Sequence, residues 1–170
     1  MKPILIAGIG NLLLGDDGIG PTVVKAFAHL HTPTPDVDVE DLGTPGLELA
    51  SYLAFRDAVI LVDALHSDLE PGTIRIFGRD KILARCIEPR IGAHASSLAD
   101  ALEALQLAGI GPRHVALVCI AGRNWQFGSP LGAEAQSSLA DARAAISSLL
   151  RAFQARLAAS GIGGHALSDA

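Results

Sequence analysis

The stretch that decides the fold is residues 4–30, ILIAGIGNLLLGDDGIGPTVVKAFAHL. It begins with a compact apolar run, Ile4–Ala7, which predicts a buried strand. A glycine-rich loop follows, and then a segment from Pro21 to Leu30 with apolar residues at helical spacing. Proline suits the first turn of a helix, where its missing N–H group costs nothing. Strand, loop and helix in this order are typical of the start of an α/β domain.

The same alternation continues to the end of the long C-terminal helical pattern. Further strands are predicted at residues 36–40, 58–62, 73–77 and 114–121, and further helices at residues 47–55, 97–108 and 129–157. The alternating run 73–77 is expected at a sheet edge, whereas 58–62 is apolar throughout, as in a strand buried on both faces. We predict one α/β domain over residues 1–160, with a mostly parallel twisted sheet, and a flexible tail over 161–170.

Composition excludes several classes of protein. The 170 residues are 49% hydrophobic and 18% charged, which is too apolar for a disordered chain. The net charge of −5, without a run of Lys or Arg, argues against a nucleic-acid partner. No apolar run approaches the ~20 residues of a membrane-spanning helix, and no small-residue cleavage site marks a signal peptide. Cys86 and Cys119 form no C-x-x-C pair, and we expect a cytoplasmic protein with reduced thiols.

Polar residues that follow the predicted strands mark the candidate site. In open α/β sheets, ligands bind beyond the carboxyl ends of the strands. Asp16 and Asp17 follow the first strand, Asp41 ends the second and Asp63 ends the third, while a later loop contains His94. Trp125 and Phe127 follow the strand 114–121, and we expect both to pack locally rather than to contact a partner.

Two chemistries fit these residues. Gly8-Ile9-Gly10 after a strand favours a dinucleotide site and a Rossmann-like oxidoreductase that uses NAD, but Leu13 stands where the third glycine is needed. Asp16 and Asp17 would also repel a pyrophosphate at the helix start, although they equally suit a simple helix-capping role. Alternatively, Asp17, Asp63 and His94 offer two carboxylates and one imidazole to a divalent ion such as zinc or nickel.

Four segments together resemble one known family. Residues 8–20, GIGNLLLGDDGIG, are similar to the N-terminal signature of the [NiFe]-hydrogenase maturation endopeptidases. In the same order, residues 41–46 resemble the glycine-rich second loop of that family, residues 59–64 its third strand with a terminal Asp, and residues 91–94 its histidine segment.

The resemblance implies a three-layer α/β/α sandwich, with one antiparallel edge strand, and metal-binding positions at Asp17, Asp63 and His94. Such enzymes remove a C-terminal extension from the precursor of the hydrogenase large subunit after nickel insertion. The nickel is supplied by the substrate, zinc or cadmium can take its place in crystals, and the resting enzyme need hold no metal. Asp17 stands where some relatives carry Glu. We expect a monomer in which Asp16 and Asp41 support catalysis, Asp16 from behind Asp17. A non-catalytic nickel-binding assembly factor remains the other alternative.

Overall fold

A computed structural model describes residues 1–84 and 93–160 of the chain. The strands are β1 (Ile4–Ile9), β2 (Val37–Gly43), β3 (Ala58–His66), β4 (Ile74–Gly78) and β5 (His114–Gly122). The helices are η1 (Gly15–Gly18), α1 (Ile19–Leu30), η2 (Gly46–Glu48), α2 (Leu49–Leu53), α3 (Arg79–Leu83), α4 (Ala93–Leu107), α5 (Ala133–Ser137) and α6 (Leu139–Ala159), where η denotes a 3₁₀ helix. The predicted tail, 161–170, lies outside the described residues.

The sheet has five strands in the order β2-β1-β3-β5-β4. The first four are parallel, and β4 pairs antiparallel with β5 at one edge. This arrangement confirms the predicted α/β class, the mostly parallel sheet and the antiparallel edge strand. It also brings the carboxyl ends of four strands to one edge of the sheet.

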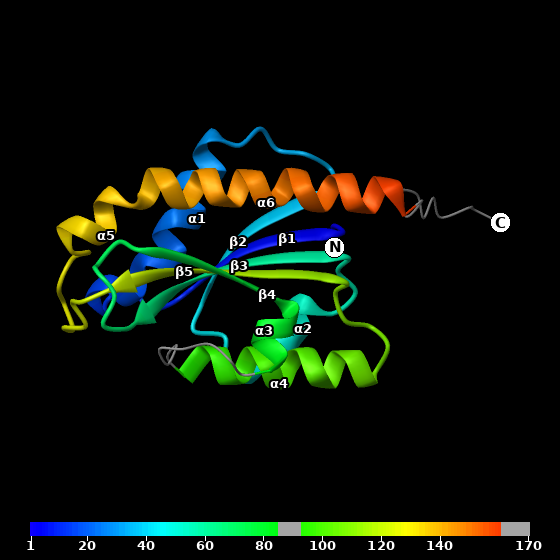
Figure 1. The fold of residues 1–170 in the computed structure, drawn as a ribbon, viewed down its shortest axis with the longest axis horizontal. Coiled ribbons are helices and arrows are strands. Elements are labelled where there is room, and N and C mark those ends of the chain that lie inside the picture. The colour runs from blue at the N-terminus through cyan, green and yellow to red at the C-terminus, as the bar shows by residue number, and fades with distance from the viewer. Residues whose placement is uncertain (85–92, 161–170) are drawn as a thin grey trace.

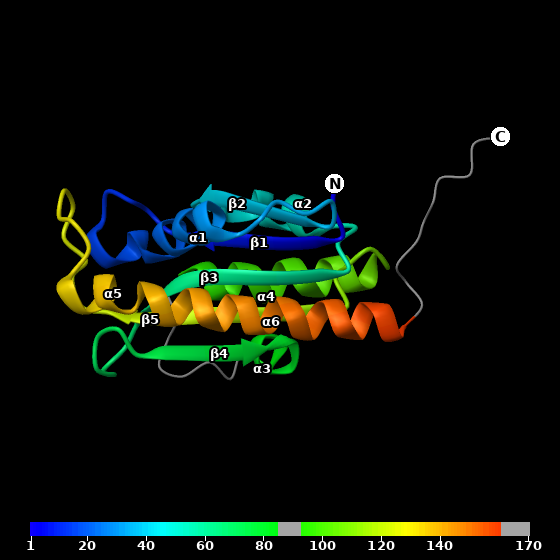
Figure 2. The same ribbon diagram turned by 90° about the horizontal axis from the view of Figure 1, so that it is seen from above.

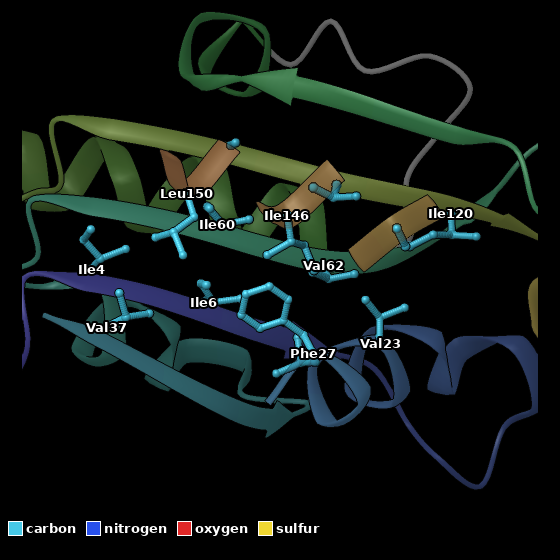
Figure 3. Close-up of a cluster of buried hydrophobic side chains, with 14 of the residues drawn as sticks. Ile4, Ile6, Val23, Phe27, Val37, Ile60, Val62, Ile120, Ile146 and Leu150 are labelled. Atoms are coloured by element: carbon cyan, nitrogen blue, oxygen red, sulfur yellow. The ribbon is translucent and has the colours of Figure 1, made fainter. Parts of the chain in front are cut away.

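Helices cover both faces of the sheet and make three layers (Figure 1). One core lies between the sheet and helices α1, α5 and α6; it includes Ile6, Phe27 and Ile146 (Figure 3). The second lies between the sheet and helices α2, α3 and α4. Alternate residues of each central strand point into the two cores, as the period of two in a strand requires. Viewed from above, α1 lies over the β1 side of the sheet and α6 over the β5 side (Figure 2).

Helix α1 begins against the backbone of the sheet itself. A Cβ atom added at Gly20 would collide with the carbonyl oxygens of Ile9 and Val62, the residues at which β1 ends and its pairing with β3 stops. A Cβ at Gly8 would in turn collide with the backbone of Gly20. These glycines let the start of α1 touch two strands directly, so the loop before α1 is held close to the carboxyl edge.

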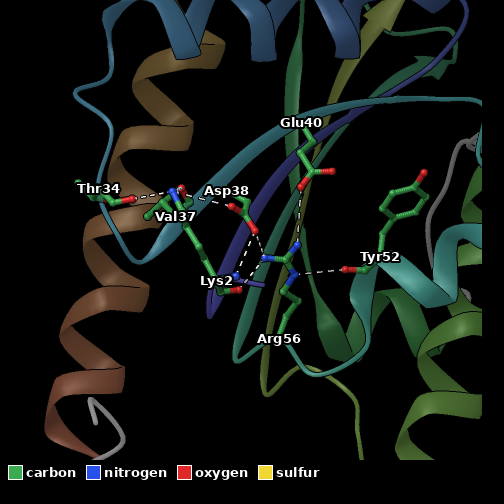
Figure 4. Close-up of polar contacts among 7 residues, drawn as sticks. All are labelled: Lys2, Thr34, Val37, Asp38, Glu40, Tyr52 and Arg56. Atoms are coloured by element: carbon green, nitrogen blue, oxygen red, sulfur yellow. Dashed lines mark hydrogen bonds and ion pairs between the residues drawn. The ribbon is translucent and has the colours of Figure 1, made fainter. Parts of the chain in front are cut away.

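A polar cluster closes the opposite, amino edge of the sheet (Figure 4). Arg56 is buried and its guanidinium bonds to the Asp38 carboxylate on β2 and to the Lys2 carbonyl oxygen. The Lys2 ammonium donates to the carbonyl oxygens of Thr34 and Val37, at 2.8 and 3.0 Å. The cluster fastens the N-terminus, the start of β2 and the turn after α2 to one another, far from the edge where the candidate residues lie.

Several predicted boundaries are wrong, and three of them bear on the candidate site or on the loop beside it. The helix expected from Ser97 begins at Ala93, so His94 lies in its first turn rather than in a loop. The helix expected from Ser129 begins at Ala133, because Gly132 is still extended and its N–H group bonds outside the helix. Strand β3 runs beyond Asp63 to His66, since β5 continues to pair with it there.

Within the described ranges, 1–84 and 93–160, the helices are too short or too polar to cross a membrane.

Candidate functional site

The candidate residues gather where the chain changes direction across the sheet. The connection from β1 to β2 runs through α1 on one face, and the connection from β2 to β3 runs through α2 on the other. The two connections leave β1 and β3 on opposite faces, and in open α/β sheets such a switch point is where a ligand crevice is expected, at the carboxyl ends of these strands. The short helix η1 lies at this point and contacts β3.

Asp17 lies in η1, half-buried at the mouth of this crevice. Its Oδ2 atom accepts a hydrogen bond from the Asn11 backbone N–H at 2.6 Å. Its Oδ1 atom accepts none from the residues that the structure describes. One oxygen is therefore tied to the loop, which fixes the orientation of the carboxylate, and the other is available to a ligand.

Asp63 lies inside β3 and is buried. It is the first residue of β3 beyond its pairing with β1, which ends at Val62. Its Oδ1 atom accepts a hydrogen bond from the N–H of Ala64 at 2.8 Å. Cys119 on β5 lies opposite Asp63 in the register of the two strands. Burial of the Cys119 thiol, together with the negative charge of Asp63, raises the pKa of that thiol well above its ordinary value. Cys119 thus stays neutral beside the carboxylate at physiological pH.

His94 lies in the first turn of α4. The helix runs from the carboxyl edge of the parallel strands toward their amino edge, so its first turn lies at the same edge as Asp17 (Figure 1). The side chain of His94 lies outside the described residues. The structure therefore places Asp17 in η1, which contacts β3, Asp63 in β3 itself and the backbone of His94 at the same edge of the sheet.

Asp16 faces a different segment from its neighbour Asp17. It is 2% exposed, and its carboxylate accepts hydrogen bonds from the backbone N–H groups of Arg123, Asn124 and Gly132 at 2.8, 2.9 and 2.7 Å. All three donors belong to the segment between β5 and α5. Both carboxylate oxygens therefore accept hydrogen bonds from this segment.

Asp41 lies at the end of β2, opposite Gly8 in the register. Its Oδ1 atom accepts a hydrogen bond from the Gly43 N–H at 3.0 Å, and its Oδ2 atom lies 2.9 Å from the Lys25 ammonium on α1. Asp41 therefore shapes the turn after β2 and joins it to α1.

Sequence reasoning missed the aromatic contact beside the site. The His66 ring at the end of β3 stacks on the Trp125 ring, with centroids 4.9 Å apart and planes at 8°. Trp125 thus packs locally, as predicted, whereas Phe127 is 73% exposed and does not. A prediction that β3 extends to His66 would have pointed to this contact, because the His66 and Trp125 rings can stack only if the strand reaches that far.

Among the side chains that the structure describes, no three His, Cys, Asp or Glu residues are grouped closely enough to hold a metal. The predicted third donor, His94, is not one of those side chains. Asp17 and Asp63 supply two carboxylates, which suit a divalent ion when an imidazole completes the set.

The glycines of the first loop have a structural explanation that needs no nucleotide. Gly10 has φ +135°, and a Cβ there would collide with the Asp17 carbonyl oxygen, while Gly8 and Gly20 admit the start of α1. The acidic side chains of Asp16 and Asp17 occupy the turn in which a pyrophosphate would bind. The site therefore does not favour the NAD-dependent alternative.

Comparisons with known sequences identify the family. Residues 21–149 match the family described as hydrogenase maturation protease. The hydrogenase 2 maturation protease of Escherichia coli K12 is 38% identical over 116 residues, which cover 68% of this chain and 70% of that protein. A hydrogenase expression/formation protein, HupD, of Bradyrhizobium diazoefficiens is 32% identical over 115 residues, but these cover only 60% of its length.

Solved structures agree with the sequence comparisons. The hydrogenase maturating endopeptidase HybD from E. coli superposes with a TM-score of 0.80 and 32% identity, covering 89% of this chain and 93% of that one. The [NiFe] hydrogenase maturation protease HybD from Thermococcus kodakarensis shares the fold, with a TM-score of 0.71 and 23% identity over 88% of this chain and 99% of that one. The family model, the E. coli relative and both solved structures are named as proteases or endopeptidases. The chain therefore belongs to the hydrogenase maturation proteases, a family of peptide-bond hydrolases.

Proposed function

We propose that this chain is the endopeptidase that removes the C-terminal extension of a [NiFe]-hydrogenase large-subunit precursor after nickel insertion. The observation that carries the proposal is the contact of η1, which contains Asp17, with β3, which contains Asp63, in a chain of this family. Neither carboxylate belongs to the salt-bridged cluster at the amino edge, where acidic residues serve the fold.

Nickel reaches the site as part of the substrate in this proposal. Asp17 and Asp63 supply oxygen ligands and His94 an imidazole nitrogen to the ion that the precursor carries. The Oδ1 atom of Asp17, which accepts no hydrogen bond from the described residues, supports this assignment. An ion shared between enzyme and precursor holds the scissile peptide at the crevice and polarises its carbonyl group.

Asp16 and Asp41 support the reaction in this scheme by positioning, not by proton transfer. The oxygens of Asp16 already accept three backbone hydrogen bonds, and those of Asp41 bind Gly43 and Lys25. Each carboxylate fixes a loop at the carboxyl edge of the sheet. Asp16 holds η1, and with it the backbone of Asp17.

The test is mass spectrometry of a nickel-containing large-subunit precursor incubated with and without the purified protein. We expect one shortened product whose lost mass equals that of a C-terminal peptide. A precursor that binds the protein but keeps its full mass would contradict the proposal and favour a non-catalytic assembly factor. A thermal shift with NAD and no cleavage would favour the oxidoreductase alternative.

We further propose that the enzyme works as a monomer in the cytoplasm. The free thiol of Cys119, buried beside Asp63, suits a reducing compartment. Among the described residues, the large exposed apolar side chains come from separate segments, as Leu47, Leu107 and Phe127 illustrate. Size-exclusion chromatography with light scattering should give the mass of a single chain, 17.6 kDa.

A further inference from the structure

Two loops at the carboxyl edge are joined by a reciprocal set of hydrogen bonds. The β1 loop is defined here as residues 10–18 and the β5 loop as residues 123–132. Asp16 accepts from three N–H groups of the β5 loop, as described above, and its own N–H donates to the Asn124 carbonyl at 2.7 Å. Farther out, the Gly128 N–H donates to the Leu13 carbonyl at 2.8 Å.

The surroundings of Asp16 are shaped for a carboxylate. A Cβ at Gly122 would lie 2.7 Å from the Cβ of Asp16, and a Cβ at Gly132 would lie 3.1 Å from its Oδ1. Gly15 has φ +54°, and a Cβ there would collide with the Asn124 carbonyl oxygen. Glycine on both sides therefore lets the carboxylate reach three amides that are remote in sequence. Asp16 holds the β5 loop in one place relative to Asp17.

The joined loops present apolar side chains to solvent beside the candidate site. Leu13 is 59% exposed and Phe127 is 73% exposed, although each loop is tightly bonded. The hydrogen bond from Gly128 to Leu13 holds the backbone next to Phe127 against the backbone of Leu13. An exposed aromatic ring on a fixed loop loses little conformational entropy on binding, which suits it to contact a polypeptide.

We propose that Asp16 is a positioning residue that fixes Phe127 for contact with the polypeptide substrate. This inference rests on the proposed function, since it concerns the substrate of the same site. Phe127 contributes binding energy to the precursor, and Asp16 contributes by keeping the β5 loop where Phe127 can reach it. Replacing Asp16 by Asn leaves one acceptor oxygen and turns an NH₂ group toward backbone donors, which releases part of the loop.

The experiment is a double-mutant cycle of Asp16→Asn and Phe127→Ala, with KM and kcat measured on the nickel-containing precursor. Phe127→Ala should raise KM about 10-fold and leave kcat within about two-fold, because it removes binding that is uniform along the reaction. Asp16→Asn should raise KM at least as much. The double variant should match Asp16→Asn alone, because Phe127 no longer contributes once the loop is released.

Hydrogen exchange tests the positioning role without catalysis. Amides of residues 123–132 should exchange faster in Asp16→Asn than in the wild type, and Phe127→Ala should leave them unchanged. Gly132→Pro is the second variant if Asp16→Asn does not fold. It removes one N–H donor to Asp16 at a φ of −61°, which proline adopts readily.

Matched controls remove a carboxylate or an exposed apolar side chain elsewhere. Asp141→Asn on α6 and Leu107→Ala, 91% exposed at the end of α4, should keep the wild-type KM. An unchanged KM in Phe127→Ala would overturn the inference, and so would additive effects of the two substitutions in the double variant. Cleavage of the precursor by the wild type would still uphold the proposed function in either case. A wild type that cleaves nothing would overturn both, and the exchange data would still report whether Asp16 holds the loop.

Discussion

Asp16 and Asp17 are adjacent in the chain, yet their carboxylates bond to different loops. Asp17 bonds to Asn11 within its own loop, whereas Asp16 bonds to amides more than a hundred positions away. Their place after the first strand could be predicted because strand ends in α/β sheets collect polar residues. The separate roles of the two residues could not be predicted from the sequence. The donors to Asp16 come from the loop after β5, and the position of that loop depends on the pairing of β3 with β5.

Asp17→Asn should reduce processing of the nickel-containing precursor by more than about 100-fold, since loss of a residue that merely orients a metal ligand already costs up to that factor. The fold should persist, because the Asn side chain can still accept the hydrogen bond from the Asn11 N–H. Initial rates by mass spectrometry, with circular dichroism on the same samples, give both results. Asp63→Asn and His94→Ala should behave alike, and Asp141→Asn on the far helix serves as the control.

If Asp17→Asn processed the precursor as fast as the wild type and the control Asp141→Asn, Asp17 would not be part of the catalytic site.

Gly20→Ala should destabilise the protein by about 3 kcal/mol, the upper part of the usual range for overpacking. The added methyl group would collide with the carbonyl oxygens of Ile9 and Val62, which are backbone atoms and cannot turn aside. Gly78→Ala is the matched control, because a Cβ there meets nothing within 4 Å and its φ is −81°. Urea unfolding of both variants measures the difference. Equal midpoints would show that α1 can move away from the sheet at little cost.

At the level of elements, apolar runs predicted every strand of the sheet, while several boundaries were wrong. Ser97 resembled a helix start, but α4 already begins at Ala93, since local capping signals compete with contacts that the sequence does not display. Asp63 looked like the end of its strand because apolar residues stop there. Strand β3 continues to His66 because β5 supplies hydrogen-bonding partners that far.

The polar cluster at the amino edge predicts a pH dependence of stability. Burial of Asp38 opposes its ionisation, but the hydrogen bonds from Arg56 and Lys2 and their positive charges outweigh it, so the pKa of Asp38 lies below its ordinary value of 3.8. A carboxyl group whose pKa is lower in the folded state than in the unfolded state stabilises the folded state above pH 3.8. This stabilisation is lost as the pH falls through the pKa of Asp38 in the folded protein. Asp38→Asn should therefore cost about 2 kcal/mol at pH 7 and progressively less below pH 3.8.

Denaturant unfolding of the wild type and Asp38→Asn between pH 7 and pH 2.5 checks this. Asp141→Asn, which removes an exposed carboxylate, should change the free energy of unfolding little at any pH. A gap between wild type and Asp38→Asn that stays constant down to pH 2.5 would contradict the prediction.

For the whole molecule, the α/β class follows from the alternation of elements, whereas strand order depends on long-range pairing. The run 73–77 was expected at an edge because it alternates, and β4 does lie there. Because β1 lies between β2 and β3, right-handed crossovers place α1 and α2 on opposite faces of the sheet. No local pattern in the sequence specifies which face each helix covers.

The proposed site of Asp17, Asp63 and His94 predicts that processing depends on whether the precursor carries nickel. A precursor from which nickel has been withheld should keep its full mass after incubation with the enzyme, and reloading it with nickel should restore cleavage. In the proposed scheme a shared ion positions the scissile peptide, so its absence would leave the encounter unproductive. Pre-treating only the enzyme with a chelator and then removing the chelator is the control, and activity should survive. Cleavage of the nickel-free precursor at the normal rate would rule out a guiding role for the ion.

The main-chain contact of Gly20 with β1 and β3 has an evolutionary consequence. No side chain separates α1 from the sheet at this point, so repacking of the neighbouring core cannot change their spacing. We therefore expect substitutions at Val23, Val24 or Phe27 to leave the residue at position 17 in the same place. Natural variation among descendants of this chain should therefore be broad at the apolar core positions and narrow at the glycines. Substitutions in the core should leave the contact made by the glycines unchanged.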